Sequence, residues 1–324
     1  MNVLLSGSNG FIGSHLKKYL TVKGFNVKCI KTENFSENDE KFLEHFNGID
    51  VVINLSGANI AHRWTDRYKK CIYSSRIDTT KKIVGALSKI QNKPSAFISM
   101  SAIGIYPKYE NKQSAGNELF NRTPNIKSLF KNKFLENNEK AKIKLNMAEA
   151  STENERNYGN DFLARVCIDW ENEARAAEKF NIRTVIFRSG VVLGKDGGII
   201  SKILPAFKYG AGCVIGSGRQ PFSWICIEDL LAAFELAINN ITMAGAYNLV
   251  TPLPVTNLEF SETLGELLNK PVYFKIPEIL LRAVFAEGAD TLTCGQLVLP
   301  ERLLNINFIF KYPDIKTALE YVLN

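Results

Sequence analysis

The glycines of the stretch LLSGSNGFIGSHL have the spacing of a nucleotide-binding loop. Gly7, Gly10 and Gly13 form a G-x-x-G-x-x-G pattern between an apolar run at 2–6 and an amphipathic pattern at 11–24. Glycines let the backbone approach a pyrophosphate closely, and the helix that follows offers free N–H groups and a partial positive charge. The residues predicted to contact a nucleotide are Gly7, Ser8, Asn9, Gly10, Phe11, Ile12 and Gly13.

The end of the second apolar run indicates which nucleotide is bound. In a dinucleotide-binding fold an Asp or Glu at this point hydrogen-bonds the ribose 2′-OH of NAD. Here the sequence CIKT places Lys31 and Thr32 there, and a cation beside a hydroxyl suits the 2′-phosphate of NADP(H). Glu33 follows directly and leaves NAD as the alternative, with Lys31 then an ordinary surface lysine.

The elements that must position this loop alternate along the first half of the chain. Buried strands are predicted at 2–6, 26–30, 50–54, 96–101 and 183–187, and helices at 11–24 and about 65–88. Strands that alternate with helices form right-handed βαβ units around a parallel sheet. We therefore predict an α/β fold with a doubly wound parallel sheet, the Rossmann architecture, and a smaller C-terminal lobe.

One segment interrupts this alternation. Residues 107–160 contain 11 Asn among 54 residues and little apolar periodicity, which predicts a low-complexity insertion that is dispensable for folding. A helix at 228–239 and a strand near 246–250 return to the βα pattern. The predicted domains are therefore a Rossmann domain at 1–250, which carries the insertion at 107–160, and a small domain at 251–324.

Composition excludes several classes of protein. The net charge of +7 comes from scattered lysines and argues against nucleic-acid binding. The six cysteines form no C-x-x-C pair and the three histidines are far apart, so no metal site is predicted. Unpaired cysteines, the lack of a signal-peptide pattern and the lack of a long apolar run predict a cytoplasmic protein without a membrane span.

Several long motifs carry a family resemblance. They occur in order along the chain: NLSGANI at 54–60, RWT at 63–65, SSRIDTTKKIV at 74–84, RSGVVLGKDGGI at 188–199, GSGRQPFSWICIEDL at 216–230 and GQLVLPERL at 295–303. With these motifs the chain resembles the extended short-chain dehydrogenase/reductases, and among them the YfcH-like epimerase-family proteins. The resemblance covers nearly the whole chain outside the insertion.

The resemblance implies a cofactor and the residues around it. It implies NADP(H) on the Rossmann sheet, with Leu55, Ser56 and Gly57 along the adenosine and ribose side and Arg76 approaching from the long helix. The segment beginning at Arg188 would pass beside the nicotinamide. The tail resembles a C-terminal domain of unknown role that the family shares.

The resemblance also exposes a gap in the expected chemistry. Relatives that transfer hydride use a Ser, and a Tyr and a Lys four residues apart, where the ammonium favours the phenolate of the Tyr. Counting along FLARVCIDWE places the Tyr position at Leu163 and the Lys position at Cys167. The Ser position falls at Ala102, with Ser101 one residue earlier. Neither Leu nor a neutral thiol can replace the Tyr-Lys pair.

Two hypotheses about function follow. In one, the protein is an NADP(H)-dependent oxidoreductase or a nucleotide-sugar epimerase-like enzyme with an atypical active site. Its catalytic candidates are Ser101, Tyr106 and Tyr158, with Asp161 as a further source of a proton, and its substrate-binding candidates are Arg188 and Arg219. In the other, the protein binds NADPH without turnover, as a regulator or sensor. Packing is the competing role for Tyr106.

Two further expectations concern the role of Cys167 and the molecules that the protein binds. Cys167 is expected beside the nicotinamide, as a small apolar filler rather than as a thiol donor. We expect a small-molecule substrate, a nucleotide sugar or another carbonyl compound, and neither nucleic acid nor membrane as a partner. The sequence leaves a homodimer open.

Overall fold

The computed structural model of the protein describes residues 1–109 and 145–324. These residues form two compact units, and each unit is assembled from separate stretches of the chain. Unit 1 comprises Met1–Ile105, Gly159–Ser189 and Ile227–Tyr247. Unit 2 comprises Tyr106–Tyr158, Gly190–Cys226 and Asn248–Asn324. The predicted domain boundary at residue 250 remains a prediction about family domains, because the chain passes between the units several times.

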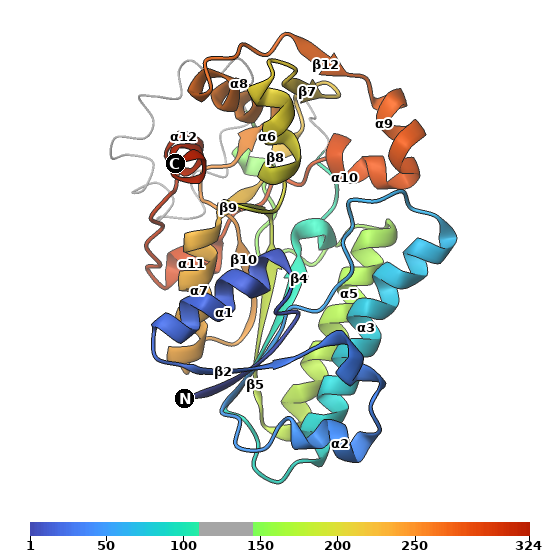
Figure 1. Cartoon of the computed structure of the whole chain (residues 1–324), viewed down its shortest axis with the longest axis vertical. Coiled ribbons are helices and arrows are strands. Elements are labelled where there is room, and N and C mark those ends of the chain that lie inside the picture. The colour runs from blue at the N-terminus through green and yellow to red at the C-terminus, as the bar shows by residue number, and fades with distance from the viewer. Residues whose placement is uncertain (110–144) are drawn as a thin grey trace. The chain divides into compact units, whose positions relative to one another are not determined.

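A six-stranded sheet is the centre of unit 1 (Figure 1). Its order is β10-β5-β4-β3-β1-β2. The strands are β1 (Asn2–Ser6), β2 (Asn26–Ile30), β3 (Val51–Asn54), β4 (Ala96–Ala102), β5 (Arg183–Ser189) and β10 (Gly245–Leu249). The pairs β1–β2, β1–β3, β3–β4 and β4–β5 are all parallel. The predicted doubly wound parallel sheet is therefore confirmed.

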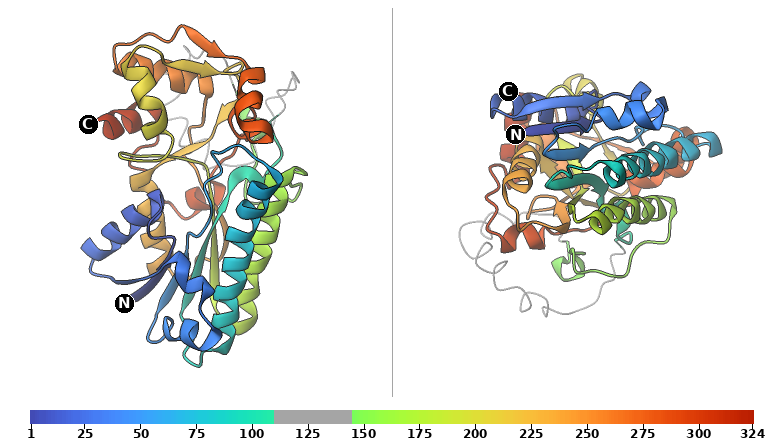
Figure 2. Two further views of the ribbon diagram at one scale, coloured as in Figure 1. Left: turned by 45° about the vertical axis from the view of Figure 1, so that its right-hand side comes forward. Right: turned by 90° about the horizontal axis from the view of Figure 1, so that it is seen from below.

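Helices cover both faces of this sheet. The helices α1 (Phe11–Val22) and α7 (Ile227–Asn239) lie on one face, and α3 (Asp66–Lys89) and α5 (Phe162–Arg175) lie side by side on the other (Figures 1 and 2). The short helix α2 (Asp39–Glu44) packs against α3. Strands covered on both faces are mostly apolar, which is why NVLLS and VVIN each contain a continuous run of three apolar residues.

The chain order of the strands creates a binding edge. Chain order runs from β1 outward to β2 and then returns past β1 to β3, so the direction of winding reverses between β1 and β3. Loops after these two strands leave the sheet on opposite sides and open a crevice at its carboxyl edge, where ligands of doubly wound folds bind. The glycine loop follows β1, and the segment Leu55–Ser56–Gly57 follows β3.

The described residues of unit 2 form three two-stranded ladders and several short helices. The ladders are β6 (Val191–Leu193) with β9 (Trp224–Cys226), β7 (Cys213–Ile215) with β12 (Phe274–Ile276), and β8 (Pro221–Phe222) with β11 (Val255–Thr256). The helices are α6 (Ile200–Lys208), α8 (Asn257–Leu267), α9 (Glu278–Phe285), α10 (Asp290–Thr293), α11 (Glu301–Asn305) and α12 (Ile315–Leu323).

Part of the predicted insertion at 107–160 belongs to the packed structure of unit 2. Ser151 forms a parallel bridge with Val298. The Glu153 carboxylate accepts hydrogen bonds from the backbone N–H groups of Asn248, at 2.8 Å, and Arg302, at 3.3 Å. These contacts argue against the prediction that the whole insertion is dispensable for folding, because removing residues 145–158 would leave backbone donors without their acceptors. Residues 110–144 of the insertion lie outside the described residues.

Candidate cofactor site

The loop between β1 and α1 is as tight as the glycine spacing predicts. Gly7 has a φ of +74°, and a Cβ there would lie 2.6 Å from the Leu55 carbonyl oxygen. A Cβ on Gly13 would lie 2.1 Å from the Gly7 carbonyl oxygen, so both positions exclude a side chain. Helix α1 has no side-chain cap at Gly10 and no acidic residue in its first turn. Its first N–H groups therefore offer a binding site for an anion such as a pyrophosphate.

A buried polar network holds the loops of β1 and β3 together. The Ser6 hydroxyl donates to the Asn54 side-chain oxygen at 2.7 Å, and the Ser56 hydroxyl donates to Ser6 at 2.9 Å. The Asn54 amide in turn donates to Thr80 of α3 at 2.8 Å. Buried polar groups with all partners in place rigidify a site. The predicted contact residue Ser56 is thus part of the scaffold that fixes the crevice.

Lys31 and Thr32 lie at the end of β2 as predicted, and both are exposed. The Lys31 ammonium is 3.9 Å from the Glu33 carboxylate, and both side chains are more than half exposed. An exposed ion pair of that kind contributes little stability, so the Lys31 side chain can leave Glu33 and bind a phosphate with little loss of free energy. The structure therefore leaves both predicted alternatives for this position in place.

Arg76 reaches from α3 onto the segment that follows β3. Its guanidinium donates to the carbonyl oxygens of Ile72 and Ala58, each at 3.0 Å. The guanidinium carbon would lie 3.1 Å from a Cβ on Gly57, so this glycine is needed for the close approach. The guanidinium also lies 5.3 Å from the centre of the Trp170 ring, a cation–π contact. Desolvation lowers the pKa of Arg76 from its ordinary value.

Leu163 and Cys167 occupy one face of α5, as residues four apart must. Both are the nearest neighbours of Gly104, which follows β4: a Cβ there would lie 3.6 Å from the Leu163 Cβ and 4.0 Å from the Cys167 sulfur. Burial raises the pKa of the Cys167 thiol to about 12. The thiol is therefore neutral at physiological pH, which agrees with the interpretation of Cys167 as an apolar filler.

The Cys167 thiol should resist alkylation in the native protein. Because the thiolate is the reactive form, a pKa of about 12 and an exposed fraction of 3% should keep Cys167 unmodified from pH 7 to pH 9. Exposed Cys71 should react first. Mass spectrometry after timed iodoacetamide treatment, with Cys71→Ser as the control, measures this. Native labelling of Cys167 at the rate of Cys71 would contradict it.

Ser101 and Arg188 meet at a buried carboxylate. The Ser101 hydroxyl donates to Glu171 of α5 at 2.8 Å. The Arg188 guanidinium grips the same carboxylate through Nε at 2.7 Å and Nη2 at 2.8 Å. All three side chains are under 5% exposed. This arrangement argues against the predicted catalytic role of Ser101 and the predicted substrate role of Arg188, because both side chains serve to join β4 and β5 to α5.

The remaining catalytic and substrate candidates belong to unit 2 or to the start of α5. The Tyr106 hydroxyl donates to the Asn248 side-chain oxygen at 2.8 Å, and its side chain is 1% exposed, which favours packing over proton transfer. Tyr158 is half-buried, and Arg219 is exposed in the loop before β8. Asp161 caps α5 by accepting from the Ala164 N–H at 2.9 Å. None of these contacts establishes a catalytic role.

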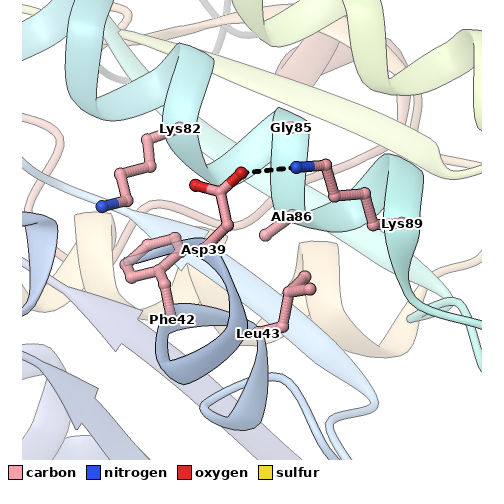
Figure 3. A pocket seen from close by; sticks show the side chains of 7 residues that line it. All are labelled: Asp39, Phe42, Leu43, Lys82, Gly85, Ala86 and Lys89. Atoms are coloured by element: carbon pink, nitrogen blue, oxygen red, sulfur yellow. Dashed lines mark hydrogen bonds and ion pairs between the residues drawn. The ribbon is translucent and has the colours of Figure 1, made fainter. Parts of the chain in front are cut away.

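A small hollow lies elsewhere on unit 1, between α2 and α3 (Figure 3). The C-terminal half of α3 lines it, at the amino ends of the strands and so at the opposite edge from the glycine loop. Lys89 forms an ion pair with Asp39 there at 2.5 Å, and Lys82 donates to the Phe35 and Glu37 carbonyl oxygens. Both cations are thus engaged, and the hollow is a poor candidate for a ligand site.

The described residues contain neither a clustered metal site nor a membrane-spanning helix. Over residues 1–109 and 145–324, no three His, Cys, Asp or Glu side chains come together as a metal site would require. No helix within those ranges combines the length and the apolar character that a bilayer span needs.

Comparison with known proteins agrees with this geometry. Residues 3–127 match the model of the NAD dependent epimerase/dehydratase family, and residues 276–322 match a domain of unknown function, DUF1731. The epimerase family protein YfhF of Bacillus subtilis is 30% identical over 100% of this chain and 98% of its own length. The chain belongs to the epimerase family. The mouse epimerase family protein SDR39U1 is 33% identical to this family member over 99% of both chains.

A solved structure supports the fold of this epimerase-family protein over its whole length. The crystal structure of human epimerase family protein SDR39U1 with NADPH matches with a TM-score of 0.80 and 27% identity, over 99% of both chains. A UDP-glucuronic acid 4-epimerase from Bacillus cereus matches with a TM-score of 0.71 at 15% identity, which indicates the fold alone. The family resemblance predicted from the motifs is confirmed.

Three residues that organise the site were not predicted from the sequence of this family member. They are Asn54, Trp170 and Glu171. The one signal for Asn54 is a polar residue at the end of an otherwise apolar strand, where a buried amide requires partners. Trp170 and Glu171 lie in an ordinary amphipathic helix, and nothing in its pattern indicates which strands they face.

Proposed function

We propose that this protein binds NADPH at the carboxyl edge of unit 1. The observation that carries the proposal is the uncapped N-terminus of α1 behind a glycine loop with no room for side chains. The NADPH in the structure of human SDR39U1, which resembles this chain over its full length, supports the same cofactor. Gly7–Gly13 would hold the pyrophosphate, and Lys31 with Thr32 would hold the 2′-phosphate. Leu55–Gly57 and Arg76 would line the crevice next to the pyrophosphate.

We further propose an NADP(H)-dependent oxidoreductase or epimerase-like enzyme with an atypical active site. When bound, the cofactor supplies or accepts hydride. The chain's contribution is then to orient the cofactor and to provide a proton from a group other than the usual pair, since Leu163 and neutral Cys167 occupy those positions. A nucleotide sugar or another carbonyl compound remains the proposed substrate class.

A non-catalytic NADPH sensor is the second candidate, and one observation favours it. The hydroxyls of Ser101 and Tyr106 are both hydrogen-bonded to buried partners, to Glu171 and to Asn248. Measuring NADPH oxidation over a panel of aldehydes and sugar-nucleotide ketones separates the two candidates. Turnover that Tyr106→Phe or Tyr158→Phe abolishes supports the enzyme. Binding without turnover over the whole panel supports the sensor.

NADPH should bind more tightly than NADH, and Lys31→Asp should reverse the order. A cation near a phosphate at a protein surface contributes enough for roughly tenfold discrimination, which is about 1.4 kcal/mol. Titration calorimetry with both cofactors measures the ratio.

Glu33 provides the matched control for this experiment. It is the carboxylate that lies 3.9 Å from Lys31, so Glu33→Gln should leave the preference for NADPH intact or increase it. Equal affinities for NADPH and NADH in the wild-type protein would show that Lys31 is an ordinary surface lysine.

A further inference from the structure

Arg76 and Arg188 are two cations of unit 1 that differ in their partners. The neighbouring Arg188 is paired with Glu171 in a bidentate ion pair. Within the described part of the chain, Arg76 forms no ion pair with a carboxylate, and its hydrogen bonds go to two neutral carbonyl groups. A guanidinium has five N–H donors, so these two bonds leave three for a ligand.

The position of Arg76 along the sheet edge assigns it to one half of a dinucleotide. A dinucleotide crosses the carboxyl edge of a doubly wound sheet with its pyrophosphate at the first helix and one half on each side of the switch point. Lys31, after β2, lies on the adenosine side. Arg76 lies over Gly57, after β3, and against Trp170 of α5, which packs on β4. This placement puts Arg76 on the nicotinamide side, which differs from the adenosine and ribose side that the family resemblance implies for Leu55–Gly57.

Several contacts hold the guanidinium in this place. The Trp170 indole N–H donates to Thr80 at 2.9 Å, so the ring under Arg76 has a fixed orientation. Ala58 and Ile72 hold two of the nitrogens, and Gly57 leaves the gap that the guanidinium plane fills. A charge fixed in this way cannot turn away when a like charge is brought near it.

We propose that Arg76 makes this site selective for the redox state of the cofactor, favouring NADPH over NADP⁺. The proposal rests on the proposed NADPH binding. The nicotinamide ring carries one positive charge in NADP⁺ and none in NADPH, whereas the phosphates are the same in both. A fixed cation beside the ring repels the oxidised form alone. A pair of like charges in a partly desolvated crevice is sufficient for roughly tenfold discrimination.

The test compares three ligands on the full chain by titration calorimetry: NADPH, NADP⁺ and 2′,5′-ADP, which lacks the nicotinamide half. Wild type should bind NADPH roughly tenfold more tightly than NADP⁺. Arg76→Met should bring the two dissociation constants close together and leave that of 2′,5′-ADP unchanged. Arg76→Lys, which keeps the charge, should retain most of the preference, and thermal melts without ligand report whether each variant is folded.

The outcomes separate this proposal from the cofactor proposal. Equal wild-type affinities for NADPH and NADP⁺ overturn the role of Arg76 and leave NADPH binding in place. A loss in Arg76→Met that is the same for all three ligands means that Arg76 only shapes the loop after β3, which also overturns the proposal. No binding of NADPH or 2′,5′-ADP to wild type overturns the cofactor proposal itself. Equal wild-type affinities overturn the proposal even if Arg76→Met does not fold.

Discussion

Replacing Glu171 with glutamine is expected to destabilise unit 1 by about 3–5 kcal/mol, the usual cost of removing one partner of a buried ion pair. The substitution keeps the shape of the side chain and removes its charge. It leaves the Arg188 guanidinium, which is 1% exposed, without the carboxylate that accepts two of its hydrogen bonds. The free energy of unfolding from urea denaturation measures the loss.

Two further variants sharpen this prediction. Arg188→Met should cost less than Glu171→Gln, because Ser101 still donates to Glu171 and Arg175 lies 3.6 Å from it. The double variant Glu171→Leu with Arg188→Met should recover part of the loss, since an apolar pair of similar volume often replaces a buried ion pair without penalty. A loss below about 0.5 kcal/mol in Glu171→Gln would show that the pair does not hold α5 on the sheet.

Restoring the missing acid–base pair should raise hydride transfer by about 10²–10⁴-fold, the usual contribution of general acid–base catalysis. The change is Leu163→Tyr with Cys167→Lys. Both positions lie against Gly104 in the turn after β4, a residue without a side chain. Steady-state NADPH oxidation with small aldehydes and sugar-nucleotide ketones measures the gain, after titration shows that the variant still binds NADPH.

The charge of Arg76 affects the design of the Leu163→Tyr, Cys167→Lys variant. Besides burial, Glu171, which is paired with Arg188, and then Arg76 act electrostatically on the pKa of the Cys167 thiol, so a lysine at 167 would meet the like charge of Arg76. Adding Arg76→Met should therefore give the larger gain. Cys167→Lys alone is the control and should remain as slow as wild type. If neither the double nor the triple variant exceeds wild type although both bind NADPH, the missing pair is not what limits this site.

The positions of the strands and the nucleotide loop could be predicted because their causes are local. A strand covered on both faces is mostly apolar at its centre, so NVLLS and RTVIF are recognisable without their neighbours. The loop at Gly7 requires a positive φ, and Gly13 requires a contact too close for a Cβ. Both constraints act within a few residues, and only glycine satisfies them.

The insertion shows where composition alone misleads. Its high content of Asn, Lys and Glu indicates a segment that cannot form a core of its own, and this led to the boundaries 107–160. Residues near Ser151 nevertheless pair with the backbone at Val298, and Glu153 accepts backbone N–H groups far along the chain. A segment whose hydrogen-bond partners lie far away in the sequence has no local sequence signature, because backbone hydrogen bonds are available to any residue type.

The sequence alone was sufficient for the α/β class, the parallel sheet, the family and the absence of Tyr and Lys from FLARVCIDWE, since each follows from residue types at short spacing. Only the tertiary structure showed that Arg188 is paired with Glu171, that Ser101 donates to the same carboxylate, and that Arg76 lies over Gly57 with carbonyl groups as its hydrogen-bond partners. These residues come from different strands and helices. Which charges neutralise each other depends on distances between elements far apart in the chain, and no pattern of residue types along the chain encodes those distances.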